Sequence, residues 1–63
     1  MDEYIVLEKY PRLNTEVWFH LDLQYYNVMV DGVFVFTSNL LIEVADYINT
    51  LFQDLEYQEV HNE

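Results

Sequence analysis

Residues 38–57 read S-N-L-L-I-E-V-A-D-Y-I-N-T-L-F-Q-D-L-E-Y, and their apolar positions recur at spacings of three and four. That spacing is typical of one face of an amphipathic helix. The apolar face comprises Leu41, Val44, Ile48, Leu51 and Leu55, widened by Ala45 and Phe52. The opposite face carries Glu43, Asp46, Thr50, Gln53, Asp54 and Tyr57. No Gly or Pro interrupts the run, and Ser38 can cap the first turn. The stretch predicts a helix over about residues 39–57, followed by a frayed tail over residues 58–63.

The residues before this helix predict an antiparallel sheet. Residues 3–9 form a β-branched and aromatic run that is typical of a strand, and the loop around Pro11 ends it. Residues 15–23 alternate apolar and polar side chains, as a half-buried strand does. Residues 25–30 and 33–37 flank Asp31-Gly32, the preferred two-residue hairpin connection, because both of its residues need a positive φ.

The alternation changes phase near Leu23-Gln24. Apolar side chains occupy odd positions up to Leu23 and even positions from Tyr26. This indicates either a bulge in one long bent strand or a tight turn, and the absence of Gly, Pro and Asn at the corner favours the bent strand. We therefore expect residues 1–63 to form a single α+β domain. It has an antiparallel three- or four-stranded meander followed by one C-terminal amphipathic helix, packed on one face of the sheet.

The size and composition bear on how such a domain is stabilised. A chain of 63 residues buries only about 60% of its unfolded surface, so its stability is marginal. Cysteine is absent, which excludes disulfides and thiolate metal sites. Half of the residues are hydrophobic (52%), which leaves dense packing or a second subunit as the source of stability. A homodimer is therefore expected.

The hairpin around Asp31-Gly32 is apolar on both faces. If the strands alternate regularly, one side is lined by Val28, Val30, Val33 and Val35, and the other by Met29, Phe34 and Phe36. One helix covers only one face of a sheet. The other face then needs the curled first strand, a second copy or a target protein, and exposed apolar surface of this kind marks a binding site.

The charge balance is strongly acidic. Twelve Asp and Glu residues oppose only Lys9 and Arg12, for a net charge of −10. This argues against direct binding to nucleic acid or to an anionic membrane, and it favours a basic protein partner. Solubility alone is the other explanation. No run of residues is long enough for a membrane span, and the start of the chain lacks a basic leader region, so the cytoplasm is expected.

Catalytic residue patterns are nearly absent. Ser38 is the sole serine and Gly32 the sole glycine, so there is no glycine-rich phosphate loop. Trp18, His20 and Asp22 would share one face of a strand, where a histidine and a carboxylate could bind a metal or move a proton. Two ligands do not complete a site. We expect neither an enzyme nor a cofactor or metal.

The acidic residues could instead form a binding surface. Glu43, Asp46 and Asp54 span eleven residues, or about 16 Å of helix. A DNA strand carries roughly five phosphates over that length, so the helix alone is a sparse mimic. Carboxylates from the sheet would add a second row; we expect Glu16, Asp22 and Asp31 to contribute. The expected apolar and aromatic contacts are Trp18, Tyr26, Phe34, Phe36 and Tyr57.

In size, acidity, aromatic content and lack of cysteine, the chain resembles the small acidic inhibitor proteins of bacteriophages. Those proteins target uracil-DNA glycosylases, restriction enzymes, CRISPR nucleases, recombination nucleases or RNA polymerase. The resemblance implies a DNA mimic that blocks the basic cleft of a nucleic-acid-binding protein in the host cytoplasm, and it assigns no role to any residue. The alternative is a self-assembling structural or adaptor subunit whose acidity serves solubility.

Overall fold

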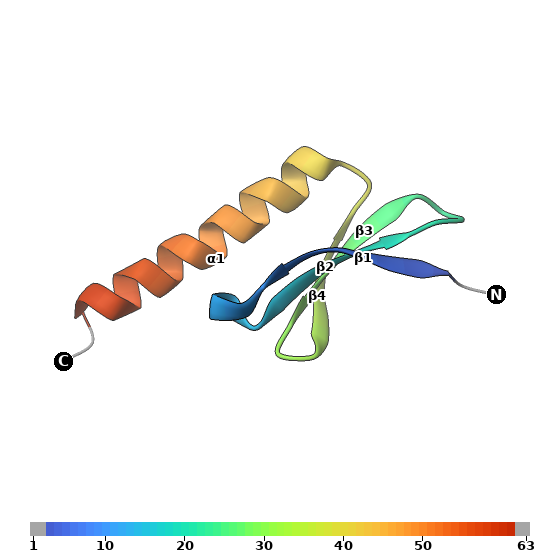
Figure 1. Cartoon of the computed structure of the whole chain (residues 1–63). Helices are drawn as coiled ribbons and strands as arrows, with labels where there is room; N and C mark the ends of the chain where they lie inside the picture. The colour runs from blue at the N-terminus through green and yellow to red at the C-terminus, as the bar shows by residue number, and fades with distance from the viewer. Residues whose placement is uncertain (1–2, 62–63) are drawn as a thin grey trace.

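The computed structural model describes residues 3–61, which form one sheet and one long helix (Figure 1). The element order is β1 (Tyr4–Tyr10), the short 3-10 helix η1 (Pro11–Leu13), β2 (Thr15–His20), β3 (Tyr25–Val30), β4 (Val33–Ser38) and α1 (Leu41–His61). All neighbouring strands are antiparallel, in the order β1-β2-β3-β4. The expected α+β meander with one C-terminal helix on the sheet is confirmed, with four strands.

A tight turn separates β2 from β3, so the single bent strand favoured by the sequence is wrong. β2 ends at His20 rather than near Leu23. The N–H of Gln24 donates to the His20 carbonyl at 2.9 Å, and the N–H of Leu23 donates to His20 Nδ1 at 3.0 Å. Gln24 takes a left-handed conformation with φ of 55°. These bonds to His20 form the turn without a Gly, Pro or Asn.

The hairpin between β3 and β4 has the expected turn. Asp31 and Gly32 both have positive φ, 54° and 81°. Val30 pairs with Val33, as the hairpin pattern predicts. A two-residue turn therefore sets the start of the ladder.

A β-bulge then changes the register of β4. Val28 pairs with Phe36 instead of Val35. Phe36 consequently lies on the helix side of the sheet, where its ring stacks on Tyr47 with centroids 4.5 Å apart. The expectation that Phe36 shares a face with Phe34 is wrong, because the bulge adds one residue between them.

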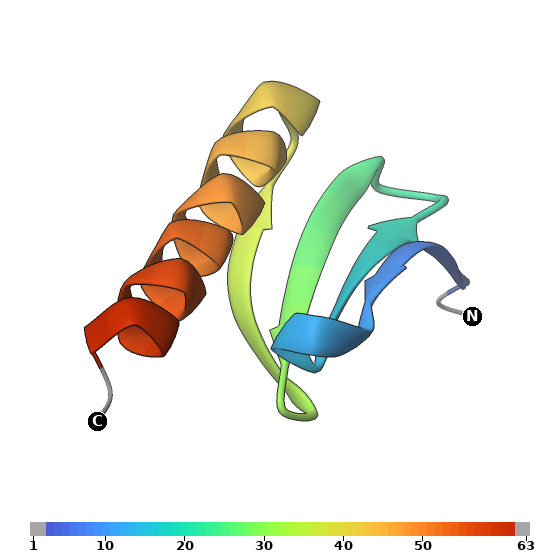
Figure 2. The same cartoon turned by 60° about the vertical axis from the view of Figure 1, so that its left-hand side comes forward.

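The helix covers only part of the sheet. Figure 2 shows α1 beside β4 and β3, with β1 farthest from it. The buried core consists of Val17 and Val28 from the sheet with Val44 and Ile48 from the helix. Leu41 lies on the same helical face by spacing but is 59% exposed, so close packing of the helix begins at Val44.

The ends of α1 differ from the sequence expectation. Ser38 ends β4, and its hydroxyl oxygen accepts the N–H of Leu40 at 3.0 Å while the hydroxyl donates to Glu43 Oε1. Ser38 therefore orders the approach to the helix instead of capping its first turn directly. The helix continues to His61, past the expected end at Tyr57. Residues 62–63 of the expected frayed tail lie outside the described residues.

Within residues 3–61, α1 lacks the apolar length that crossing a membrane would require.

Candidate protein-binding surfaces

An aromatic cluster occupies the face of the sheet opposite α1. Trp18 follows the buried Val17 along β2, so its side chain lies on that opposite face. Its ring contacts Phe34 and Tyr4, with centroids 5.6 Å and 5.9 Å away. We call this group the open-face cluster; its members are Tyr4, Trp18, His20, Tyr25 and Phe34.

The first strand covers part of this face. Tyr4 of β1 contacts the rings of both Trp18 and Phe34, and its hydroxyl bonds to that of Tyr25 at 3.0 Å. Asn27 is buried and accepts a hydrogen bond from the Thr37 hydroxyl. Phe34 nevertheless stays 46% exposed, so apolar surface remains at the β4 side of the cluster.

His20 is a structural residue of the β2–β3 corner. It is 2% exposed, its ring stacks on Tyr25, and Nδ1 accepts the Leu23 N–H. Asp22 lies in the turn and not on β2, so the expected strand face shared by Trp18, His20 and Asp22 does not form. Across residues 3–61, no three His, Cys, Asp or Glu side chains are grouped as metal ligands would be.

The five expected aromatic contacts do not form one surface. Trp18 and Phe34 belong to the open-face cluster. Tyr26 and Phe36 lie half-buried against the core on the helix side. Tyr57 is 65% exposed on α1. Regular alternation could not separate Phe36 from Phe34, because the bulge between them depends on the pairing with β3.

The expected acidic residues of the sheet are also dispersed. Glu16 lies on the open face, where Oε1 accepts the Trp18 indole N–H at 2.8 Å. Asp22 and Asp31 lie in the turns at opposite ends of β3. Asp31 accepts a hydrogen bond from the Asn14 side chain at 2.8 Å. These three carboxylates therefore cannot act as one row.

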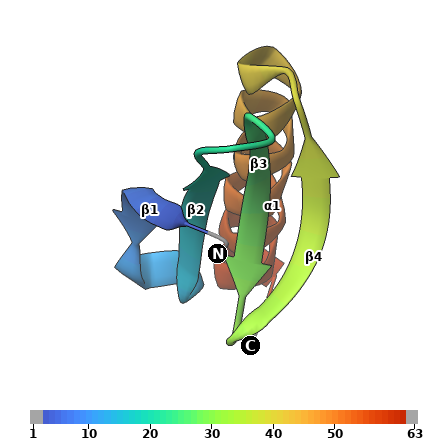
Figure 3. The same cartoon turned by 90° about the vertical axis from the view of Figure 1, so that its right-hand side faces the viewer.

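Four of the six expected acidic residues nevertheless line two pockets along α1. Glu43 and Asp46 line a shallow pocket with Phe36 of β4. Asp31 and Asp54 line a second one with Val30, which pairs with Val33 of β4. Figure 3 shows β4 as the outermost strand with α1 behind the sheet. We call Glu43, Asp46, Asp54 and Asp31 the β4 flank.

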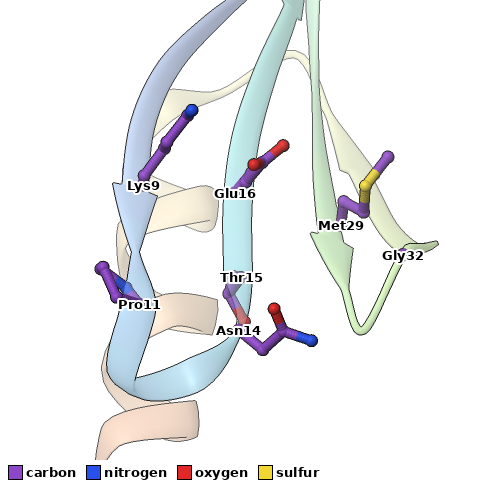
Figure 4. A pocket seen from close by; sticks show the side chains of 7 residues that line it. All are labelled: Lys9, Pro11, Asn14, Thr15, Glu16, Met29 and Gly32. Atoms are coloured by element: carbon purple, nitrogen blue, oxygen red, sulfur yellow. The ribbon is translucent and has the colours of Figure 1, made fainter.

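The two basic residues belong to β1 and to η1, which follows it. Arg12 of η1 forms an ion pair with Glu59, with Nη2 and Oε1 3.1 Å apart. Lys9 of β1 lines a third pocket with Glu16 and Met29 (Figure 4). Among the described residues, neither Lys9 nor Arg12 lines the two pockets of the β4 flank, although Lys9 shares its pocket with Gly32, the residue after Asp31.

Comparisons of the chain with protein-family models, with curated proteins and with solved structures found no match. Function is therefore inferred from these surfaces alone.

Proposed function

We propose that this protein is a small acidic inhibitor that binds a basic nucleic-acid-binding protein and blocks its cleft, in the cytoplasm of the cell or, if a bacteriophage encodes it, of the host. The observation that supports this is the segregation of charge. Glu43, Asp46, Asp54 and Asp31 line two pockets of the β4 flank, whereas Lys9 and Arg12 belong to β1 and η1 and line neither pocket. A surface of one sign attracts a surface of the opposite sign.

The two kinds of surface have different tasks in binding. Long-range attraction by carboxylates raises the association rate, and it weakens as salt is added. Buried aromatic and apolar contacts set the residence time. The exposed Phe34 and Val33, on the strand next to the β4 flank, supply the apolar contact.

Mimicry of a nucleic acid is the mechanism that we infer for the acidic surface. Glu43, Asp46 and Asp54 alone are too widely spaced to replace the phosphates of one strand. Asp31 joins them from the sheet, beside Asp54. Carboxylates from two elements thus stand in for phosphates over a larger area than the helix offers.

The test is capture followed by displacement with DNA. The immobilised protein is incubated with lysate of its natural cell or host at about 50 mM salt, and bound proteins are challenged with a 20-base-pair duplex or with about 300 mM salt. We expect basic nucleic-acid-binding proteins to be captured and both challenges to release them. Captured proteins that do not bind nucleic acid, or that remain bound during both challenges, would reject the proposal.

Two triple variants of equal charge locate the surface. E43Q/D46N/D54N neutralises three residues of the β4 flank, whereas E3Q/E8Q/D22N neutralises three exposed carboxylates away from it. We expect the first variant to lose most of the DNA-displaceable capture and the second to retain most of it. Equal losses of capture by the two variants would mean that net charge, and not the position of the carboxylates, determines binding.

Self-assembly is a second candidate function, favoured by the exposed apolar side chains of β4. Val33, Phe34 and Val35 are 60%, 46% and 46% exposed. A homodimer or larger assembly would cover them, and the acidity would then serve solubility. Light scattering at about 100 µM protein and moderate salt tests for self-assembly. A subunit that assembles with a micromolar Kd would be mostly oligomeric at that concentration.

A further inference from the structure

The outer edge of β4 is open to pairing. The sheet order ends at β4, whose only neighbour in the sheet is β3. No described element hydrogen-bonds to its outer side. An unpaired edge strand presents a row of backbone N–H and C=O groups that can pair with another extended segment.

β4 also lacks most of the features that protect sheet edges. Residues 33–38 read V-F-V-F-T-S, with no charged residue and no Pro. The opposite edge, β1, carries Glu8 and Lys9, and charged side chains discourage edge pairing. β4 does contain the bulge at Val35, so an added segment can pair regularly only over short stretches on either side of it.

The surroundings of β4 decide what kind of segment fits. On the helix side, an added strand meets Glu43 and Asp46 beside Phe36, and at the β3–β4 turn it meets Asp31, whose pocket Asp54 also lines. On the open face, it meets Phe34 and, next to it, Trp18. Side chains of a strand alternate between the two faces. The complementary segment therefore alternates basic with apolar residues.

A second copy of this chain fits less well. Its own β4 contains no basic residue. Pairing two β4 strands would bring two acidic flanks together without a cation between them, and like charges repel. Charge complementarity thus favours a basic partner over self-pairing.

From these observations we propose that the β4 edge binds, by strand addition, an extended segment of a partner protein in which Lys or Arg alternates with apolar residues. This rests on the proposed function and deepens it, because it names the element that docks and the sequence character of the partner. Backbone pairing and the apolar face hold the segment, and the β4 flank selects for its positive charge.

The test is calorimetric titration of the whole protein with a capped octapeptide of alternating Lys and Val. We expect binding in the micromolar range, with slower amide hydrogen exchange within residues 33–38. Two control peptides separate the contributions. The same peptide N-methylated on its four central residues cannot pair through its backbone, and a peptide with four Lys followed by four Val lacks alternation. Neither should bind measurably.

Protein variants then place the site. Val33→Lys puts a cation on the strand edge, and Val60→Lys makes the same change at an exposed position near the end of α1. We expect V33K to reduce peptide affinity by about tenfold or more and V60K by less than about twofold. D46N/D54N should weaken binding roughly fivefold, with E3Q/E8Q as its charge-matched control. Circular dichroism checks that each variant folds. If V33K does not fold, the comparison of D46N/D54N with E3Q/E8Q tests the site instead.

Three results would overturn the inference: binding of the N-methylated peptide, equal affinities of V33K and V60K, or a dimer of the unmodified protein that V33K dissociates. The last would assign the edge to a second copy. The inhibitor proposal does not require that the partner bind by strand addition at this edge. Persistence of DNA-displaceable capture with V33K would sustain the inhibitor proposal while strand addition failed, and absence of this capture from the unmodified protein would reject the inhibitor proposal regardless of the peptide result.

Discussion

At the scale of single residues, Gly32 offers a clean test of backbone strain. Its φ is +81°, and a Cβ placed there would meet no atom within 4 Å. Replacement by Ala therefore changes backbone conformational energy without a steric clash. We expect Gly32→Ala to lower the free energy of unfolding by about 1–2 kcal/mol. Urea denaturation followed by circular dichroism measures this loss.

The control for that experiment is Gly32→Asn. Asparagine tolerates the left-handed region better than alanine, so its loss should be smaller. An Ala variant as stable as the unmodified protein would show that the hairpin adopts another turn.

Residue identity predicted the β3–β4 turn but not the β2–β3 turn. Asp31-Gly32 carries its own conformational preference, so the hairpin could be recognised locally. The turn before Tyr25 could not, because Gln24 has no such preference. It is held by bonds to His20, whose side chain also packs between Tyr4 and Tyr25. Tertiary packing thus determines a turn that composition does not mark.

At the scale of elements, the bulge in β4 gives two phenylalanines different environments. Phe36 stacks on Tyr47 beside the core, whereas Phe34 is 46% exposed on the open face. We expect Phe36→Ala to cost about 3 kcal/mol of unfolding free energy and Phe34→Ala about 1 kcal/mol. The two chemically identical substitutions are compared by urea denaturation. Similar losses of unfolding free energy would mean that Phe36 shares a face with Phe34, as regular alternation predicts.

The helix and the strands were largely predictable, and the departures share one cause. The periodicity of α1 was clear over residues 39–57, and a β-branched and aromatic run, an alternating run and the Asp31-Gly32 connection indicated the strands. Face assignment failed at Phe36, and Leu41 remains exposed, because both depend on contacts between elements: the pairing of β4 with β3 for Phe36, and the packing of α1 on the sheet for Leu41. A periodic pattern says which side chains share a face, and it does not say how far the neighbouring element extends over that face.

At the scale of the whole molecule, self-repulsion should make stability depend on salt. The chain has a net charge of −10, and its described residues contain the single ion pair Arg12–Glu59. Added salt screens the repulsion among carboxylates. We expect the Tm to rise by about 5 °C between 10 mM and 300 mM NaCl.

The variant E3Q/E8Q/D22N is the control for this salt effect. With three fewer negative charges, it should start from a higher Tm at low salt and gain less from added NaCl. A Tm that falls as salt is added would mean that attractive ion pairs outweigh repulsion.

For the candidate site, the sequence offers a prediction of which side chains take part, and it offers none of how they are arranged. The sequence indicated that carboxylates and aromatic side chains would form the binding surface. It could not indicate that Asp31 of a turn and Asp54 of the helix line one pocket, since twenty-three positions separate them and only the packed helix brings them together. Likewise, the sequence placed Asp22 on a strand, whereas the structure places Asp22 and Asp31 in turns at opposite ends of β3.

The indole of Trp18 has a practical consequence. It is the chain's one tryptophan, it is half-buried, and it lies against Phe34 with its N–H bonded to Glu16. Its emission spectrum responds to water and to neighbouring dipoles, so an occupant laid over that region would displace solvent and shift the emission to shorter wavelength. The molecule thus carries its own optical reporter, which can follow association in real time without a dye.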